Sequence, residues 1–349
     1  MTDLIMHGCT DVGQRSQNED CFLVDADLAL AVVADGMGGH ASGDVASRMV
    51  VDIVRAEVAA GQSLEMALEQ SHVAVLGAAR GNDSARMGAA VVTARFTGAE
   101  YQVCWVGDCR AYLWSGELVQ LTRDHSYVET LLSTGKISWE EAQNRPDRNL
   151  ITQAIGGSED IQVDVCCVRG TLSPGEELLL CSDGLNDVLR GREIAEILAG
   201  SGDLQDRCQQ LVDTAKAAGG RDNITALLVT GAGTPLEIPA AEPGSLHPPP
   251  VSISRLDGSV DYFTASGDKL TANAASSALD LTTPDPDVTA VRAAAAPVQP
   301  RAPVRQAGRF SAARGYRTLP SFGRSLVVGL GLGGLLVVSV LLGRWLLGV

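Results

Sequence analysis

The order of the expected helices and strands predicts an α+β fold, in which helices pack on the outer faces of antiparallel sheets. Two adjacent helices separate two groups of strands, and the later strands follow each other closely along the chain. That pattern favours antiparallel sheets over a simple doubly wound sheet. We expect this fold in residues 1–232, followed by a disordered linker at 233–324 and a transmembrane helix at 325–347.

The individual elements follow from hydrophobic periodicity and from capping residues. Helical spacing of apolar residues predicts two long helices, with Ser42 and Ser63 as their N-caps. Short apolar runs predict strands over Val32–Ala34, Ala89–Phe96, Tyr101–Val106, Ala111–Trp114 and Leu178–Cys181. Helices are expected over Gly43–Ala60, Ser63–Arg80, Tyr127–Thr134, Arg192–Ala199 and Leu204–Ala218.

Charge and cysteine content narrow the class of protein. The formal net charge of −15 argues against non-specific binding of nucleic acid, and it suits either a carboxylate-lined metal site or simple solubility. The eight cysteines include no Cys-x-x-Cys pair, and most lie in apolar, strand-like runs. The start of the chain does not resemble a signal peptide. We therefore expect thiols rather than disulfides, in a reducing cytoplasm.

Proline marks the predicted boundary between the folded part and the linker. Only Pro146 and Pro174 precede residue 235, and the remaining prolines fall between Pro235 and Pro320. The segment 233–324 is rich in Ala, Pro, Ser and Thr, so it offers too little apolar surface to offset the entropy of ordering. A short element near Val260–Phe263 stays open as an exception.

An uncharged segment after the linker predicts a single membrane span. Leu326–Leu342 would form a helix about 25 Å long, which Trp345–Leu347 would lengthen. A buried globular helix is the alternative, but a disordered linker leaves it no core to join. Arginines are concentrated before the span, up to Arg324. The positive-inside rule therefore predicts an inner-membrane protein whose folded part lies in the cytoplasm.

Acidic residues occur where apolar runs meet glycine. Asp35, Asp108 and Asp183 each follow a predicted strand, Asp222 precedes the last one, and Glu19 with Asp20 opens another. An Asp-Gly pair after a strand is also a common turn, so a single instance would carry little weight. If these strand ends converge, the carboxylates repel one another unless cations lie among them.

Oxygen ligands without a His or Cys cluster favour Mg²⁺ or Mn²⁺ over Zn²⁺. Two such ions bridged by one aspartate could share a water and lower its pKa, which would give a hydroxide nucleophile at neutral pH. Arg15 could bind a phosphate group at the same place, or it could form a surface ion pair with Glu19. Spacing alone does not decide between these two interpretations.

Six sequence segments then carry a resemblance to a known family. They resemble, in the family's order, the motifs of the bacterial 2C-type metal-dependent protein serine/threonine phosphatases, the PPM family. The resemblance covers about residues 1–230 and implies an α/β/β/α sandwich. The six segments are Asp11–Asp20, Ala34–His40, Val106–Tyr112, Leu121–His125, Cys181–Leu185 and Gly220–Thr225.

The resemblance implies a role for each acidic residue. Asp35 would bridge two Mn²⁺ or Mg²⁺ ions together with the Gly36 carbonyl, while Asp183 and Asp222 would complete the first site. Glu19 would hold a metal-bound water. Asp108 would hold a weaker third ion with Asp183, and Asp20 would support the opening motif from behind. The residue matching the phosphate-binding arginine is Arg15, and the segment matching a mobile flap is Ile137–Arg148.

Two departures from the family pattern concern the region around Asp35. Gly88-Ala-Ala90 stands where many members have Gly-Thr-Thr, which removes two hydroxyl groups. Met37 stands where many eukaryotic members have histidine, so the acid that protonates the leaving group stays open. A metal-bound water or His40 could serve, although a histidine beside a Gly-Gly turn is often structural.

The sequence thus predicts a membrane-anchored phosphatase acting on phosphoserine and phosphothreonine in proteins. Two alternatives stay open: a catalytically weak regulator that binds phosphoproteins, and a phosphatase of small phosphorylated metabolites. The expected partners are phosphorylated proteins and an opposing serine/threonine kinase, with no nucleic acid. Thr282-Thr-Pro-Asp285 resembles sites that forkhead-associated domains bind when phosphorylated, so such a protein is a further expected partner.

Overall fold

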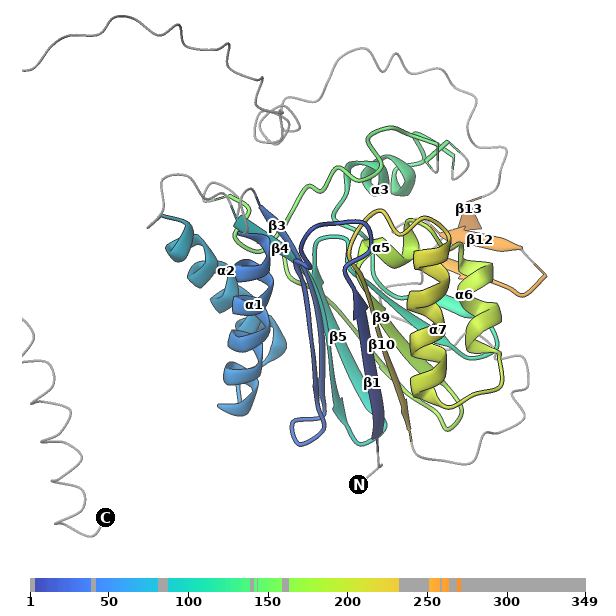
Figure 1. The fold of residues 1–349 in the computed structure, drawn as a ribbon, viewed down its shortest axis with the longest axis horizontal. Coiled ribbons are helices and arrows are strands. Elements are labelled where there is room, and N and C mark those ends of the chain that lie inside the picture. Colours follow the sequence, from blue (N-terminus) through green and yellow to red (C-terminus); the bar gives the residue numbers. More distant parts are fainter. Residues whose placement is uncertain are drawn as a thin grey trace, which may run out of the picture. The chain divides into compact units, whose positions relative to one another are not determined.

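The computed structural model describes residues 4–38, 42–80, 87–138, 141–142, 144–158, 163–231, 251–257, 259–263 and 269–270. All of these residues belong to one compact unit, Met1–Ala296. Two antiparallel sheets pack face to face, and helices cover both outer faces (Figure 1). This arrangement confirms the predicted sandwich of two antiparallel sheets flanked by helices.

The five-stranded sheet is covered on its outer face by α1 (Gly43–Ala59) and α2 (Leu64–Arg80). Its strands alternate between two apolar layers. In β3, Val32 packs toward the helices and Val33 toward the other sheet, because successive side chains point to opposite faces. The strand order is β2 (Asp20–Asp25), β3 (Leu30–Gly38), β4 (Met87–Thr97), β5 (Glu100–Val106) and β8 (Cys166–Thr171).

The eight-stranded sheet is covered by α6 (Gly191–Leu198) and α7 (Leu204–Ala217), which bury Ile194 and Leu211 against it. The short helix α5 (Asp183–Asn186) follows β9 directly. The strand order is β1 (Leu4–Asp11), β10 (Ile224–Gly231), β9 (Glu177–Cys181), β6 (Arg110–Trp114), β7 (Leu118–Gln120), β11 (Ser252–Ser254), β12 (Val260–Phe263) and β13 (Lys269–Leu270).

The predicted helices are confirmed to within two residues at their ends, including α3 (Tyr127–Ser133). The two predicted N-cap residues differ in their hydrogen bonds. The Ser63 hydroxyl accepts a hydrogen bond from the Met66 amide at 3.3 Å, as an N-cap should. Ser42 is the N-cap residue of α1, as predicted, but its side chain makes no capping bond. Its hydroxyl is buried at the start of α1, where the backbone packs closely against β3.

Three strands come from within the predicted linker, so the sheet extends past the predicted boundary at residue 232. β11 pairs with β7, β12 pairs with β11, and β13 pairs with β12, all antiparallel. Ile253 is 7 % exposed and joins the core between the two sheets. The strand β12 matches the short element that stayed open near Val260–Phe263, whereas β11 and β13 were not expected.

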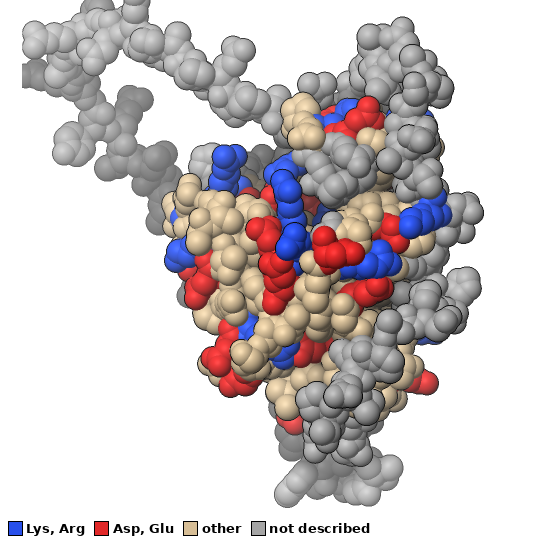
Figure 2. Space-filling model, turned by 90° about the vertical axis from the view of Figure 1, so that its right-hand side faces the viewer, with Lys and Arg blue, Asp and Glu red and all other residues tan. Residues whose placement is uncertain are grey.

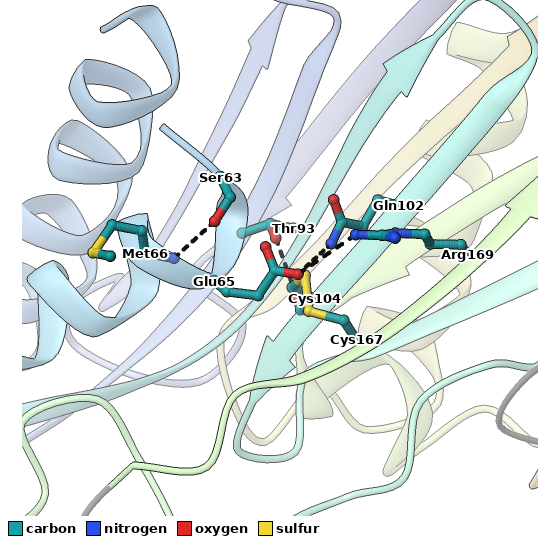
Figure 3. The surroundings of a disulfide bond; sticks show 8 residues. All are labelled: Ser63, Glu65, Met66, Thr93, Gln102, Cys104, Cys167 and Arg169. Atoms are coloured by element: carbon teal, nitrogen blue, oxygen red, sulfur yellow. Dashed lines mark hydrogen bonds and ion pairs between the residues drawn. A yellow bond between two sulfur atoms is a disulfide. The ribbon is translucent and has the colours of Figure 1, made fainter. Parts of the chain in front are cut away.

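The expectation of thiols is wrong for two of the eight cysteines. Cys104 on β5 and Cys167 on β8 form a disulfide, and the other six are free thiols. The pairing follows from strand register, because Cys104 lies directly opposite Cys167 in the antiparallel ladder. Figure 3 shows the disulfide beneath Glu65 of α2, whose carboxylate accepts a hydrogen bond from Gln102 at 2.7 Å.

Several predictions fall on residues outside the described ranges. These are the arginine-rich end of the linker, the threonines of Thr282–Asp285 and the predicted span at 325–347. Within the described ranges, no helix combines the length and the apolar character needed to cross a membrane.

Candidate active site

Four predicted site residues gather at one end of the sandwich, although they come from different elements. Asp35 lies near the end of β3, Asp108 follows β5, Asp183 begins α5, and Asp222 precedes β10. The charges of the other three aspartates all act on the carboxyl group of Asp35, so the four lie near one another. Since β3 and β10 belong to different sheets, the site forms only where both sheets end together.

The backbone at Gly36 lies too close to its neighbours for any other residue. A Cβ atom on Gly36 would lie 2.0 Å from the Gly43 carbonyl oxygen and 2.6 Å from that of Glu19. The Gly36 amide donates to the Glu19 carbonyl at 3.1 Å, and the Glu19 carboxylate lies close to the backbone of Gly43. Gly43 begins α1, where the helix dipole favours a negative charge.

The carboxyl groups at this end are strongly perturbed. Burial, followed by the charges of neighbouring aspartates, raises the pKa of Asp35 and Asp108 well above the ordinary value. The same two causes raise the pKa of Asp183 to about 7. Three buried carboxylate oxygens, the Oδ1 atoms of Asp20, Asp44 and Asp183, have no hydrogen-bond partner. Like charges and unpartnered acceptors are the arrangement that divalent cations would stabilise.

Asp20 is held from behind, as the resemblance implies. Its Oδ2 atom accepts hydrogen bonds from the Ser182 hydroxyl at 2.7 Å and from the Thr225 hydroxyl at 2.6 Å. Burial raises the pKa of Asp20 to about 6, and these two bonds oppose that rise. Because Ser182 and Thr225 belong to the eight-stranded sheet region and Asp20 to β2, the contact joins the two sheets beside the site.

Arg15 pairs with a predicted metal ligand rather than with Glu19. Its Nη2 atom lies 2.6 Å from Asp222 Oδ2, and the two side chains are 55 % and 36 % exposed. The charge of Arg15 still lowers the pKa of Glu19, against the larger effect of burial, which raises it. Arg15 therefore lies at the exposed rim of the carboxylate cluster, within reach of a group bound there.

Two residues that organise the site had no predicted role. The Asn223 side chain accepts a hydrogen bond from the Glu19 amide at 2.8 Å and donates to the Val12 carbonyl at 2.9 Å. The His125 ring accepts a bond from the Gly107 amide at 3.2 Å, which fixes the loop that carries Asp108. Both residues lie inside the motif segments quoted above, and that position is the signal that could have identified them.

The acidic end, which is formed by Asp35, Asp108, Asp183 and Asp222, also adjoins the predicted flap at Ile137–Arg148. The helix α3 and the residues after it bury their own small apolar cluster, formed by Val128, Leu131, Leu132, Ile137 and Ala142. Beyond this cluster, the Asn149 side chain donates to Asp187 Oδ2 at 2.6 Å, and Asp187 immediately follows α5. The segment is thus connected to the element that carries Asp183.

The donor set fits Mg²⁺ or Mn²⁺, because it consists of carboxylates and one backbone carbonyl. In the described part of the chain, the one trio of metal-ligand atoms within 4.8 Å of one another is Glu65, Cys104 and Cys167, whose sulfurs already form the disulfide. The carboxylates of the acidic end are spread more widely. His40 lies outside the described residues, so its predicted catalytic role stays a prediction.

Comparisons with known proteins agree with this geometry. The family model described as protein phosphatase 2C matches residues 8–229. The serine/threonine phosphatase stp of Listeria monocytogenes is 37 % identical over 236 residues, which span 63 % of this chain and 93 % of that protein.

Two solved structures are also similar. The crystal structure of the Mycobacterium tuberculosis serine/threonine phosphatase PstP/Ppp has a TM-score of 0.61 and 31 % identity, covering 66 % of this chain and 99 % of that one. The catalytic domain of PstP in complex with two manganese ions has a TM-score of 0.58 and 30 % identity, covering 65 % and 97 %. The matched segment contains every carboxylate of the acidic end, and the chain belongs to the protein phosphatase 2C family of metal-dependent serine/threonine phosphatases.

Proposed function

We propose that this protein serine/threonine phosphatase holds two Mn²⁺ or Mg²⁺ ions in its carboxylate cluster and acts on phosphoproteins beside a membrane. The observation that carries the metal site is the gathering of four aspartates from both sheets, with buried oxygens that have no hydrogen-bond partner. The PstP catalytic domain in complex with two manganese ions supports the choice of ion.

The residues that would hold the ions are those at the ends of the strands. Asp35 would be shared by both ions, with the Gly36 carbonyl contributing. Asp183 and Asp222 would complete the first site, and Glu19 would hold a water. Asp108 would hold a weaker third ion together with Asp183. When bound there, the ions lower the pKa of water and neutralise charge on the phosphoryl group.

Arg15 would bind the phosphate group of the substrate. Its guanidinium group lies at the exposed rim, next to Asp222, and can donate two parallel hydrogen bonds to phosphoryl oxygens. Asp20, fixed by Ser182 and Thr225, would hold β2 and Glu19 in place during this binding. His40 remains a proposed donor of the proton that the leaving oxygen needs.

A phosphopeptide assay tests the proposed chemistry. The purified full-length protein should release phosphate from a phosphothreonine peptide in the presence of Mn²⁺. Release should fall to background in EDTA and return when Mn²⁺ is added in excess. Phosphate release that is unchanged in EDTA would contradict the proposed metal site.

Membrane attachment is the second part of the proposal. Its support is the sequence alone: the predicted span at 325–347, whose stretch Leu326–Leu342 carries no charge, follows a run of arginines that ends at Arg324. The phosphatase domain would then lie in the cytoplasm, tied to the inner membrane by a disordered linker. Full-length protein should resist salt and carbonate washes of membranes, whereas a chain lacking 325–349 should be released. Recovery of the full-length chain in the soluble fraction would refute the anchor.

The proposed partners are phosphorylated proteins, an opposing serine/threonine kinase and a forkhead-associated domain protein. The last of these depends on phosphorylation within Thr282–Asp285, because such domains bind phosphothreonine through charge-assisted hydrogen bonds. Mass spectrometry of the protein from its own cells should detect phosphate on one of these two threonines. Complete absence of that modification would remove this partner.

A further inference from the structure

A short hairpin lies outside the part of the chain that matches the family, which ends at residue 229. We call residues 251–257 and 259–263 the added hairpin; they contain β11 and β12. The hairpin is well anchored, since β11 pairs with β7 along its length and the Val251 amide donates to the Gln120 carbonyl at 3.1 Å. Val251 is 2 % exposed and Ser252 is 4 % exposed, so the hairpin is built into the domain.

The added hairpin reaches the flap through Tyr262. This side chain packs against the apolar cluster of α3 and the residues that follow it. A second connection runs through Arg123, whose guanidinium donates to the Phe263 carbonyl at 3.3 Å and to Glu129 Oε1 at 3.1 Å. Glu129 lies in the first turn of α3. The hairpin therefore contacts α3 by both apolar and charged groups.

A cavity of about 100 Å³ lies where the hairpin, α3 and the acidic end meet. Its lining includes Val251 and Tyr262 of the hairpin, Val128, Glu129 and Leu132 of α3, and Asp108 and Asp183 of the acidic end. The hairpin therefore forms one wall of the cavity between α3 and the proposed metal ligands. A displaced hairpin would change the distance between α3 and these ligands.

Ion pairs hold the hairpin in its own conformation. Arg255 contacts Glu117 at 2.6 Å and Asp261 at 3.0 Å, and Lys269 contacts Asp261 at 2.5 Å. Figure 2, which views the molecule from the side on which Figure 1 draws β12 and β13, shows acidic and basic side chains next to each other. Single exposed pairs stabilise little, but a linked set restricts the geometry of the strands that carry it.

We propose that the added hairpin positions α3 over the acidic end, and that it thereby sets the KM for phosphoprotein substrates. A peptide flanking the phosphorylated residue must fit against the flap, whereas a small aryl phosphate needs only the acidic end and Arg15. Tyr262 is a positioning residue in this account, since it acts through α3. The inference rests on the proposed function, because its readout is phosphate release at that site.

The test compares variants of the full-length chain on two substrates, a phosphothreonine peptide and p-nitrophenyl phosphate, both with Mn²⁺. Tyr262→Ala removes the ring that packs on the flap. Tyr262→Phe keeps the ring and removes only the hydroxyl group. Leu256→Ala, in the same hairpin but 42 % exposed, is the matched control. Hydrogen exchange of Tyr127–Ser133 reports the order of α3 in each variant.

Tyr262→Ala should raise the peptide KM about five-fold and speed exchange in α3, with aryl phosphate kinetics unchanged. Tyr262→Phe and Leu256→Ala should behave as wild type. An unchanged peptide KM with unchanged exchange would overturn the proposal. Equal loss on both substrates would also overturn it, because the hairpin would then serve stability alone. If the wild-type protein released phosphate from neither substrate, the proposed function itself would fail.

Discussion

The buried carboxylates of this protein fall into two groups, one paired with arginines and the other surrounded by further carboxylates. Away from the acidic end, Glu177 receives both guanidinium arms of Arg207, which also donates to the Leu198 carbonyl at 2.8 Å. Beside the acidic end, Asp124 is also held by an arginine, since Nη2 and Nε of Arg110 donate to it at 2.6 Å and 2.9 Å. At the acidic end, carboxylates face one another instead, and the buried Oδ1 atoms of Asp20 and Asp183 have no hydrogen-bond donor.

The difference separates structural carboxylates from functional ones. A buried carboxylate with an arginine has its charge compensated within the fold, so it needs nothing more. A group of buried carboxylates repels itself, and this repulsion is relieved only when cations or protons bind. Burial alone would not have distinguished the two groups, since Glu177 and Asp108 are both 7 % exposed.

The largest expected effect comes from Asp35→Asn at the acidic end. Losing the shared carboxylate weakens both proposed metal sites, and several kcal/mol of transition-state stabilisation correspond to about a 10³-fold fall in kcat. The metal-free variant should unfold at a higher temperature than metal-free wild type, because one repelling charge is gone. Near-normal kcat in the purified variant would contradict the assignment.

A substitution in the Glu177–Arg207 pair should change stability rather than kcat. Arg207→Met leaves the Glu177 carboxylate buried without its partner, so the free energy of unfolding should fall by about 3–5 kcal/mol. The kcat of the folded fraction should not change. The double variant Glu177→Leu with Arg207→Met should recover most of the stability in urea titrations. A single variant as stable as wild type would show that this pair contributes little.

Without metal, the stability of the protein should depend on pH through the carboxyl groups of the acidic end. Folded-state pKa values of about 6 for Asp20 and about 7 for Asp183 lie above the ordinary value of 3.8. A raised carboxyl pKa stabilises the fold below the unfolded pKa, and this contribution is lost as pH rises. In EDTA the melting temperature should therefore decline from about pH 4 to about pH 7, and saturating Mn²⁺ should abolish the decline. A melting temperature that is flat in EDTA would argue against the repulsion.

Arg15→Ala should have the smallest effect on stability. Its ion pair with Asp222 is more than one-third exposed on both sides, so the free energy of unfolding should change by about 0–1 kcal/mol. The KM for the phosphopeptide should rise, and kcat should fall as well if the contact tightens in the transition state. Unchanged kinetics would leave Arg15 as a surface ion pair.

Local patterns in the sequence predicted much of the fold and of the candidate site. The helices α1, α2 and α7 follow from apolar periodicity that their own residues contain, and the structure confirms them. Asp35 and Asp183 were identifiable because each follows an apolar run and precedes glycine. The requirement for glycine at residue 36 is different, since it depends on the close approach of Gly43 and Glu19.

The sequence by itself thus determined the fold class and the family, because apolar periodicity and short motifs can be recognised within a few neighbouring residues. The tertiary structure alone decided the disulfide between Cys104 and Cys167, which are 63 residues apart, the pairing of β11 with β7, and the contact of Arg15 with Asp222. These outcomes depend on strand register and on which sheet edge remains open. Both are set only when distant segments compete for the same hydrogen bonds and the same core.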